Sequence, residues 1–341
     1  MIWMVEEKVN MTKRGRPPNV AVVLTTRMGS ERQFGKVFAD VVGKPLIYWI
    51  TQRLDEIGKV IIGTTTDPQN DVLEQWGKDN GYPVYRHPDE SDVVARVMAA
   101  VEQYHPTAQF IMRGLNDCPF IVPEFANRAV SLMKQYSGDS MYWVLPPFQE
   151  ALYGATEFPR SRHAWDIIAA NAQGDEREHP DIYFHRNRDK FNVIYHEPPP
   201  ARYFRPYRLE VDWKEDLELV CKLSEVYGRL PTMEEAIATL DRDDTLYKIN
   251  RMRIEKTGMS VSYLQHDRQR WWTLIRGKSI VMWDDTTWDF GEDGEPIFCK
   301  AKACLLGVVR KGKLYQKDVV IEGDAFIKCP CGAGRRWQEK A

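Results

Sequence analysis

Short apolar segments alternate with longer amphipathic stretches from Val20 to about Gly138. Continuous apolar runs rich in β-branched residues predict buried strands at residues 20–26, 59–66, 82–86 and 109–114. Apolar residues at helical spacing predict helices at residues 45–57, 67–81, 92–104 and 123–136. Strands and helices that alternate in this order form a parallel sheet with both faces covered. The sequence therefore predicts an α/β fold, a Rossmann-like, mostly parallel sheet with helices on both faces.

The pattern changes after this region. Residues 141–148 and 191–200 predict two strands that flank an insertion, and residues 208–212 lead into a predicted helix at 213–228. From about Lys256 the helical periodicity fades while tryptophans and cysteines accumulate, which predicts a separate, small β-rich domain. We divide the chain into a flexible tail (1–18), a larger α/β domain (19–255) and a C-terminal domain (256–341). The basic segment 13–18 of the tail also suits a DNA minor groove, although its prolines and like charges favour an ordinary tail.

Composition removes several classes of protein from consideration. The 341 residues are 43% hydrophobic, enough for a substantial core, and 47 Lys plus Arg against 49 Asp plus Glu give a net charge of -2. This charge provides no overall attraction to nucleic acid or to an anionic membrane. No apolar run approaches the roughly 18 residues of a membrane span, and the N-terminus lacks a signal peptide's apolar core, so we expect a cytoplasmic protein without a membrane partner.

A cationic loop directly follows the first predicted strand. It contains Arg27, Gly29, Arg32, Gly35 and Lys36. Ligands of parallel sheets bind beyond the carboxyl ends of the strands, and cations beside exposed backbone N–H groups suit a polyphosphate. The loop is not a P-loop, because five residues separate its glycines and Val37 replaces the Ser or Thr that would hold magnesium. A solvated basic turn is the alternative.

Several segments together resemble the motifs of one enzyme family, in the same order. TRMGSERQFGKVF (26–38) is similar to the signature A-R-M-G-S-x-R-L-P-G-K-x-L, and IMRGLNDCPFIVPE (111–124) is similar to V-V-R-I-T-G-D-C-P-L-I-D-P-E. Further similar segments lie at residues 63–71, 89–97, 177–179 and 209–220. Over about residues 20–250 the chain resembles the bacterial cytidylyltransferases of the spore-coat polysaccharide type, relatives of the CMP-sialic acid and CMP-Kdo synthetases.

The resemblance implies a nucleotide-diphospho-sugar transferase fold and transfer of a cytidylyl group from CTP to a sugar hydroxyl, with release of pyrophosphate. The residues it implies for nucleotide and triphosphate contacts are Arg27, Gly29, Ser30, Arg32, Lys36, Asp92, Arg96 and Arg113. It implies Asp117 and Asp212 as magnesium ligands, so the catalytic set is Arg27, Lys36, Asp117 and Asp212. The chain differs from the family pattern at four places. It has Thr25-Thr26 where the family has Gln-Ala, Gln33-Phe34 where it has Leu-Pro, Asn116 where it has Gly, and Trp213-Lys214 where it has Thr-Pro.

The positions of the two acidic residues in the predicted sheet independently indicate a metal site. Asp117 follows the strand predicted at 109–114 and Asp212 follows residues 208–211, so in a parallel sheet both carboxylates reach the same rim and can share one hard cation. Each has a simpler alternative: Asp212 could be the N-cap of the next helix, and Asp117 could brace a turn. Arg96 could lie on an exposed helix face, and His179 could be a surface histidine.

Four cysteines near the C-terminus form two close pairs, Cys299 with Cys304 and Cys329 with Cys331. Two such turns facing each other would make a tetrahedral thiolate site, so we expect a structural Zn²⁺ and a zinc-ribbon-like domain. Free buried thiols are the alternative, and a secreted disulfide framework does not fit the uneven cysteine spacing.

The leading hypothesis is a magnesium-dependent CTP:sugar cytidylyltransferase of polysaccharide biosynthesis, whose partners are CTP and a small sugar. A homodimer is one assembly that this hypothesis allows. Two alternatives come from other classes. The chain could bind a nucleotide or nucleotide-sugar without turnover, or its C-terminal domain could recruit nucleic acid or a protein. A glycosyltransferase is a further enzymatic alternative, which would release a nucleoside phosphate instead of pyrophosphate.

Overall fold

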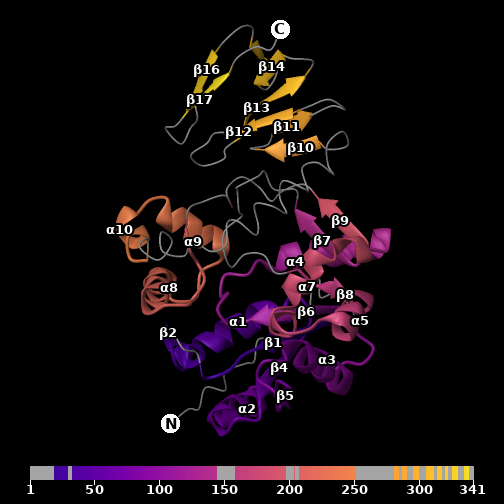
Figure 1. Cartoon of the computed structure of the whole chain (residues 1–341). Helices are drawn as coiled ribbons and strands as arrows, with labels where there is room; N and C mark the ends of the chain where they lie inside the picture. The colour runs from indigo at the N-terminus through magenta and orange to yellow at the C-terminus, as the bar shows by residue number, and fades with distance from the viewer. Residues whose placement is uncertain are drawn as a thin grey trace.

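The computed structural model of the protein (Figure 1) describes residues 19–29, 33–143, 158–196, 203 and 207–250, together with the backbone of further strands between residues 280 and 337. Tyr195, His196 and Asp244 are described by their backbone alone. Six residues of the predicted sites lie outside the described residues, namely Ser30, Arg32, Cys299, Cys304, Cys329 and Cys331.

A five-stranded sheet forms the centre of the α/β domain. Its strands are β1 (Val20–Thr25), β4 (Lys59–Thr65), β5 (Val84–His87), β6 (Phe110–Leu115) and β8 (Arg160–Ser161). The order across the sheet is β5-β4-β1-β6-β8, and the first three pairings are parallel whereas β8 runs antiparallel to β6. The predicted parallel sheet is therefore confirmed, and its central strand is β1.

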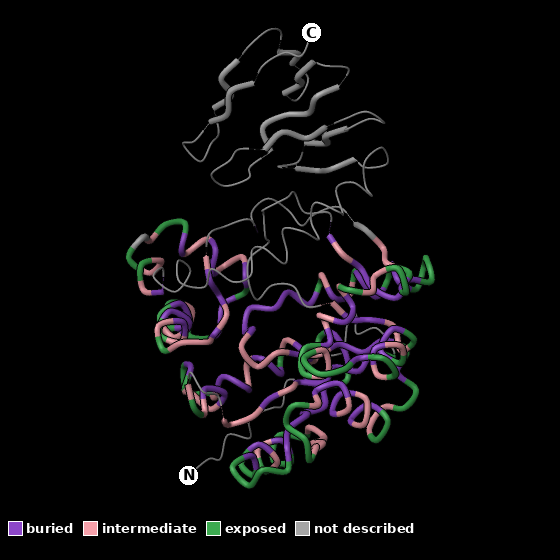
Figure 2. The backbone as a smooth tube through the Cα atoms, in the orientation of Figure 1, coloured by how far each residue is buried: buried purple, intermediate pink, exposed green. Residues whose placement is uncertain are grey.

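Helices cover both faces of this sheet, as predicted. They are α1 (Leu46–Asp55), α2 (Asp71–Asp79), α3 (Val93–Tyr104), α4 (Pro123–Tyr136) and α5 (Arg162–Asn171). Alternate residues of β1 point to opposite faces: Val22 belongs to the core that contains Ile50 of α1, whereas Val23 packs in the core with Val97 of α3 and Trp165 of α5. Figure 2 shows the buried residues concentrated between these layers. Burial of each such side chain stabilises the fold by about 1.5–3 kcal/mol.

The predicted insertion lies between two strands that form a second, parallel sheet. These are β7 (Ser140–Trp143) and β9 (Val193–His196). Between them along the chain come β8, α5, α6 (Asp175–Glu178), α7 (Pro180–Arg186) and the 3-10 helix η3 (Arg188–Lys190). The insertion matters for the site because its short helix α6 carries Glu178 to the cavity described below.

The domain closes with three helices, α8 (Lys214–Tyr227), α9 (Met233–Leu240) and α10 (Asp244–Tyr247). Gly228, with φ 63°, follows α8 in the left-handed conformation that glycine adopts at low cost. The preceding segment 208–212 is not a strand of the main sheet, contrary to the expectation that it would run parallel to β6. It crosses the carboxyl end of β6, where the backbone N–H of Val211 donates to the carbonyl of Asp117 at 2.7 Å.

Antiparallel strands make up the described part of the C-terminal region. They are β10 (Ile280–Trp283), β11 (Thr286–Asp289), β12 (Glu295–Phe298), β13 (Leu305–Arg310), β14 (Lys313–Gln316), β15 (Val319–Ile321), β16 (Ala325–Lys328) and β17 (Gly334–Trp337). The β-rich character agrees with the prediction, whereas the zinc site and the boundary at residue 256 stay predictions. Among the described residues no helix is long and apolar enough to cross a bilayer.

Candidate active site

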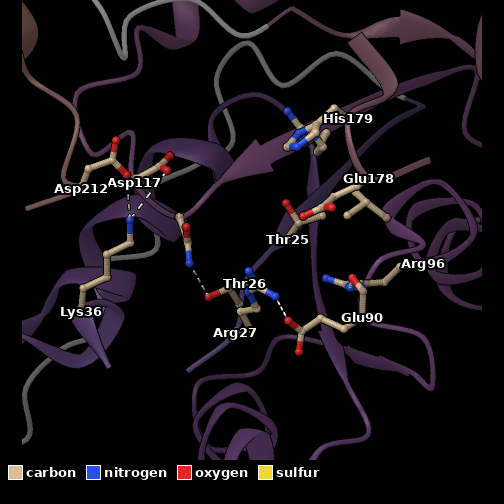
Figure 3. Close-up of a pocket in the computed structure, with 13 residues that line it drawn as sticks. Thr25, Thr26, Arg27, Lys36, Glu90, Arg96, Asp117, Glu178, His179 and Asp212 are labelled. Atoms are coloured by element: carbon tan, nitrogen blue, oxygen red, sulfur yellow. Dashed lines mark hydrogen bonds and ion pairs between the residues drawn. The ribbon is translucent and has the colours of Figure 1, made fainter. Parts of the chain in front are cut away.

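A polar cavity of about 350 Å³ lies at the carboxyl ends of β1 and β6 (Figure 3). Its lining residues are Thr25, Thr26, Arg27, Lys36, Glu90, Val93, Arg96, Arg113, Asn116, Asp117, Glu178, His179 and Asp212. Arg27, Lys36, Arg96, Arg113, Asp117 and Asp212 were predicted from the sequence, and the structure brings them into this one cavity. The location agrees with the rule that ligands of open parallel sheets bind beyond the carboxyl ends of the strands.

Lys36 is a buried cation at the acidic end of the cavity. Its residue is 5% exposed, and its Nζ donates to the carbonyl of Val211 at 2.6 Å. The same Nζ lies 3.7 Å from Asp117 Oδ2 and 3.5 Å from Asp212 Oδ1 (Figure 3). Gly35, with φ 67°, turns the chain immediately before Lys36 and donates its N–H to the carbonyl of Met28 at 3.0 Å. A residue with a Cβ atom would strain this turn, so the second glycine of the predicted loop has a conformational role.

Asp117 and Asp212 converge on Lys36 although they are far apart in the sequence. The backbone bond from Val211 to Asp117 places the two chain segments side by side. The alternative that Asp212 is the N-cap of α8 is wrong, because Trp213 is the N-cap residue. The Asp216 carboxylate, in the first turn of α8, accepts the backbone N–H groups of Asp212 at 3.0 Å and of Trp213 at 2.9 Å. Asp212 lines the cavity.

The first half of the cationic loop is held by a buried amide. Asn70 ends the 3-10 helix η2 (Pro68–Asn70), and its Oδ1 accepts the backbone N–H of Met28 at 2.8 Å. Its Nδ2 donates to the hydroxyl of Thr65, at the end of β4, at 2.7 Å. Gly29 lies beside the Gln69 side chain, where a Cβ atom would come 3.1 Å from Nε2. Gly29 is not among the lining residues, and its lack of a Cβ atom leaves room for the Gln69 side chain.

Arg27 and Arg96 supply positive charge to the opposite end of the cavity. Arg27 forms an ion pair with Glu90, while Nη2 of Arg96 donates to the Glu90 carbonyl at 2.6 Å. The alternative that Arg96 is exposed on a helix face is wrong, because the residue is only 3% exposed. Burial lowers the pKa of its guanidinium, and its Nε is buried without a hydrogen-bond partner among the described residues. An acceptor on a ligand would satisfy that donor.

Arg113 and Asp92 have intramolecular partners. Arg113 lines the cavity and its Nη2 lies 3.0 Å from Asp181, which also pairs with the buried Arg160. These two guanidinium groups hold the pKa of the Asp181 carboxyl below its usual range, against the effect of burial. Asp92 is not among the lining residues: it caps α3 by accepting the N–H of Ala95 at 2.8 Å, and it lies 2.7 Å from Nε of Arg177.

Sequence reasoning missed part of the site. Thr25, Thr26, Glu90, Asn116 and Glu178 line the cavity but were not predicted to do so. Asn116 Nδ2 donates to the Thr26 hydroxyl at 3.1 Å, so two departures from the family pattern contact each other across the ends of β6 and β1. Glu210 also escaped notice. Burial, followed by the negative charge of Asp117, raises the pKa of Glu210 to about 7. The alternation of Arg208, Glu210 and Asp212 with buried apolar residues was the available signal.

The donor set at the acidic end fits magnesium. Asp117 and Asp212 present hard carboxylate oxygens to a common position, where Lys36 shows that a positive charge is accommodated. Within the described part of the chain, no group of three or more His, Cys, Asp or Glu side chains is arranged to hold a metal ion. Two carboxylates nevertheless suffice for Mg²⁺, which commonly completes its octahedron with phosphate oxygens and water.

Comparison with known proteins identifies the family. The cytidylyltransferase family model matches residues 21–241. The chain therefore belongs to the cytidylyltransferase family, and the resemblance noted in the sequence and the assignment to this enzyme class are confirmed. The spore coat polysaccharide biosynthesis protein SpsF of Bacillus subtilis is similar, with 26% identity over 235 residues that cover 66% of this chain and 95% of that protein.

Two further comparisons agree with this assignment. The 3-deoxy-manno-octulosonate cytidylyltransferase of Saccharophagus degradans is 27% identical over 136 residues, which cover 39% of this chain and 52% of that enzyme. The structure of a cytidylyltransferase from Leptospira borgpetersenii aligns with a TM-score of 0.57 and 23% identity, covering 67% of this chain and 96% of that chain. At that identity the structural likeness supports the α/β fold.

Proposed function

We propose that this protein transfers the cytidylyl group of CTP to a hydroxyl of a sugar, in a magnesium-dependent reaction that releases pyrophosphate. The observation that carries the proposal is the convergence of Lys36, Asp117 and Asp212 in the cavity at the carboxyl ends of β1 and β6. Membership of the cytidylyltransferase family supports the cytidylyl group as the group that is transferred. The names of two relatives, a spore coat polysaccharide protein and a 3-deoxy-manno-octulosonate cytidylyltransferase, support a sugar acceptor.

The reaction needs charge stabilisation more than it needs a nucleophilic side chain. The sugar hydroxyl releases its proton to solvent and its oxygen forms a bond to the α-phosphorus, while the bond from that phosphorus to the bridging oxygen breaks and pyrophosphate leaves. Negative charge grows on the phosphate oxygens during this exchange, and positioned cations stabilise it. Lys36 and Arg27 line the cavity and are suited to this task. Lys36 is buried, so its interaction with a phosphate is weakly screened by solvent.

Asp117 and Asp212 would hold the magnesium ion, which when bound supplies a Lewis acid for the phosphate oxygens. The chain's own contribution is to keep the two carboxylates on one side of the cavity before any ligand arrives, through the backbone bond between Val211 and Asp117. Arg96 would contact the nucleotide through its buried Nε. Glu178 and His179 line the wall of the cavity and would offer polar groups to the hydroxyls of the acceptor sugar.

The test is a coupled pyrophosphate assay. The purified full-length chain is incubated with CTP, MgCl₂ and a panel of neutral, deoxy and acidic sugars, and each reaction is repeated with ATP, GTP and UTP and with EDTA. We expect pyrophosphate release that requires CTP, magnesium and at least one sugar, with a CMP-sugar of matching mass. CTP-induced thermal stabilisation without pyrophosphate across the panel would instead indicate a nucleotide-binding protein without turnover. Release of CMP from a CMP-sugar would indicate a glycosyltransferase.

A further inference from the structure

Arg208 lies directly behind the candidate magnesium ligands, outside the lining of the cavity, and is 2% exposed. Each nitrogen of its guanidinium contacts a different carboxylate. Nη2 lies 2.5 Å from Asp212 Oδ2, Nε lies 3.4 Å from Asp216 Oδ2, and Nη1 lies 3.4 Å from Glu210 Oε2. A guanidinium is planar and presents its donors in a fixed fork, so these three contacts together fix the orientation of the group.

Asp216 extends the same network to the backbone of Asp212. The Asp216 residue is 1% exposed, and its Oδ2 accepts the N–H of Asp212 at 3.0 Å. Its Oδ1 accepts Nδ2 of Asn250 at 2.9 Å, and Asn250 also donates to the carbonyl of Arg208 at 2.9 Å. Asn250 is itself 1% exposed. One buried network therefore holds both the side chain and the backbone of Asp212.

This arrangement determines which carboxylate oxygen faces the cavity. Asp212 places Oδ2 on Arg208, and its Oδ1 is turned toward Lys36, 3.5 Å from Nζ. Asp117 Oδ2 approaches the same Nζ at 3.7 Å. A carboxylate that is already oriented loses less conformational freedom when it binds a cation, and partners of metal ligands commonly change metal affinity by about 10–100-fold when they are altered.

We propose that Arg208 is a positioning residue for Asp212. Through its contact with Oδ2 it keeps Oδ1 directed at the position shared with Asp117, and thereby sets how tightly the site binds a divalent cation. The inference rests on the proposed function, because it assigns Arg208 a role in the same magnesium site. A purely electrostatic role for Arg208 predicts the opposite change in cation affinity, because loss of a nearby positive charge would strengthen cation binding.

Two variants that leave the net charge unchanged separate geometry from charge. Arg208→Lys keeps the positive charge but cannot contact three carboxylates at once. The double variant Arg208→Met/Asp216→Asn removes one charge of each sign, while the amide oxygen at position 216 can still accept the backbone N–H groups of Asp212 and Trp213. The matched control is Arg229→Lys, which alters a bidentate pair with Glu235 on an exposed surface, with distances of 2.7 and 2.9 Å.

The primary readout is Mn²⁺ binding to the full chain, measured by electron paramagnetic resonance with and without CTP, after circular dichroism has verified the fold. We expect both variants to bind Mn²⁺ about tenfold or more weakly, with a matching rise in the metal concentration needed for pyrophosphate release and recovery of turnover at high metal. Arg229→Lys should match the wild type. If the wild type binds Mn²⁺ and turns over CTP while a folded variant of either kind binds Mn²⁺ as well as the wild type or better, the role of Arg208 is refuted. A wild type with neither property refutes the proposed function instead.

Discussion

Val211 donates its backbone N–H to the carbonyl oxygen of Asp117 at 2.7 Å, and this bond joins the segment before α8 to the end of β6. Val211 also accepts the Lys36 ammonium through its own carbonyl at 2.6 Å. The peptide unit around Val211 thus links the cationic loop and both acidic residues. Because the bond between Val211 and Asp117 uses backbone atoms alone, substituting either acidic side chain leaves it in place. Variants of Asp117 and Asp212 can therefore be compared on a common backbone, whereas a Lys36 variant also loses the bond from Nζ to Val211.

We predict that Lys36→Met lowers pyrophosphate release at least about 100-fold, because loss of one preorganised donor to a developing oxyanion typically costs 10²–10³ in turnover. The variant also leaves Asp117 and Asp212 without their shared ammonium. The free energy of unfolding should therefore fall by about 1–3 kcal/mol, as measured by urea denaturation. Lys78→Met is the matched control, since that ammonium is exposed and pairs with Glu74. Equal turnover in the two variants would exclude a catalytic role for Lys36.

We predict that Asp117→Asn and Asp212→Asn each reduce turnover and raise the magnesium concentration for half-maximal activity by about tenfold or more. An amide keeps the shape of the side chain but removes the negative charge that a hard cation prefers. The measurement is pyrophosphate release over a magnesium titration at saturating CTP. Asp79→Asn serves as control because Asp79 is exposed on α2, accepts a bond from Gln75 and is not among the lining residues of the cavity. Unchanged magnesium dependence in both site variants would argue against a shared metal.

The sequence predicts most of the α/β fold because its signals are local. The helix expected at 123–136 coincides with α4, and the central strands lie within one residue or so of their expected positions. The stretch 67–81 divides into η2 and α2, because Asp67 caps the N–H of Gln69 at 2.9 Å and Pro68 begins a tighter turn. The pairing of β7 with β9 in a sheet of their own depends on contacts between distant segments, which local periodicity does not report.

The residues of the candidate site also fall into two groups, those that local sequence signals predict and those that depend on contacts between distant segments. Arg27, Lys36 and Asp117 follow predicted strands, and the position of such residues at the sheet rim follows from topology. Glu90 and Glu178 come from loops and a short helix whose approach is decided by tertiary packing. The segment 208–212 lies at the rim of the sheet without pairing as a strand of it. Asp212 still approaches Lys36 together with Asp117, because the backbone bond from Val211 to Asp117 holds the two segments side by side.

We predict that Arg96→Lys weakens CTP binding about tenfold while the fold is retained. Lysine keeps a positive charge but cannot place a donor where Nε lies and also reach the Glu90 carbonyl, since an ammonium lacks the fixed fork of a guanidinium. Isothermal titration with CTP and magnesium measures the change. The control Arg162→Lys alters a surface pair with Glu102 and Asp166. A CTP affinity equal to that of the control would remove Arg96 from the nucleotide site.

His185 makes the stability of the insertion depend on pH. Its Nδ1 accepts a hydrogen bond from Nη2 of Arg188 at 2.6 Å, which requires the neutral imidazole, and its ring lies edge-on to Tyr142. Burial, helped by the charge of Arg188, lowers the pKa of His185 from 6.5 to about 3. Below pH 6.5 the imidazole of His185 is protonated in the unfolded chain, whereas in the folded chain it stays neutral until the pH approaches 3. Stability is therefore complete above pH 6.5 and is lost as the pH falls through this window.

We predict that the free energy of unfolding falls by about 2 kcal/mol between pH 7 and pH 5 through this residue, from the size of the shift. His185→Gln removes the titration while its amide oxygen can still accept from Arg188. Urea denaturation at both pH values should therefore give a smaller loss for His185→Gln than for the wild type. The matched control is His163→Gln, at an exposed position of α5, which should lose as much stability as the wild type. Identical losses in all three proteins would mean that His185 is protonated in the folded state at pH 5, and that its bond with Arg188 breaks in that range.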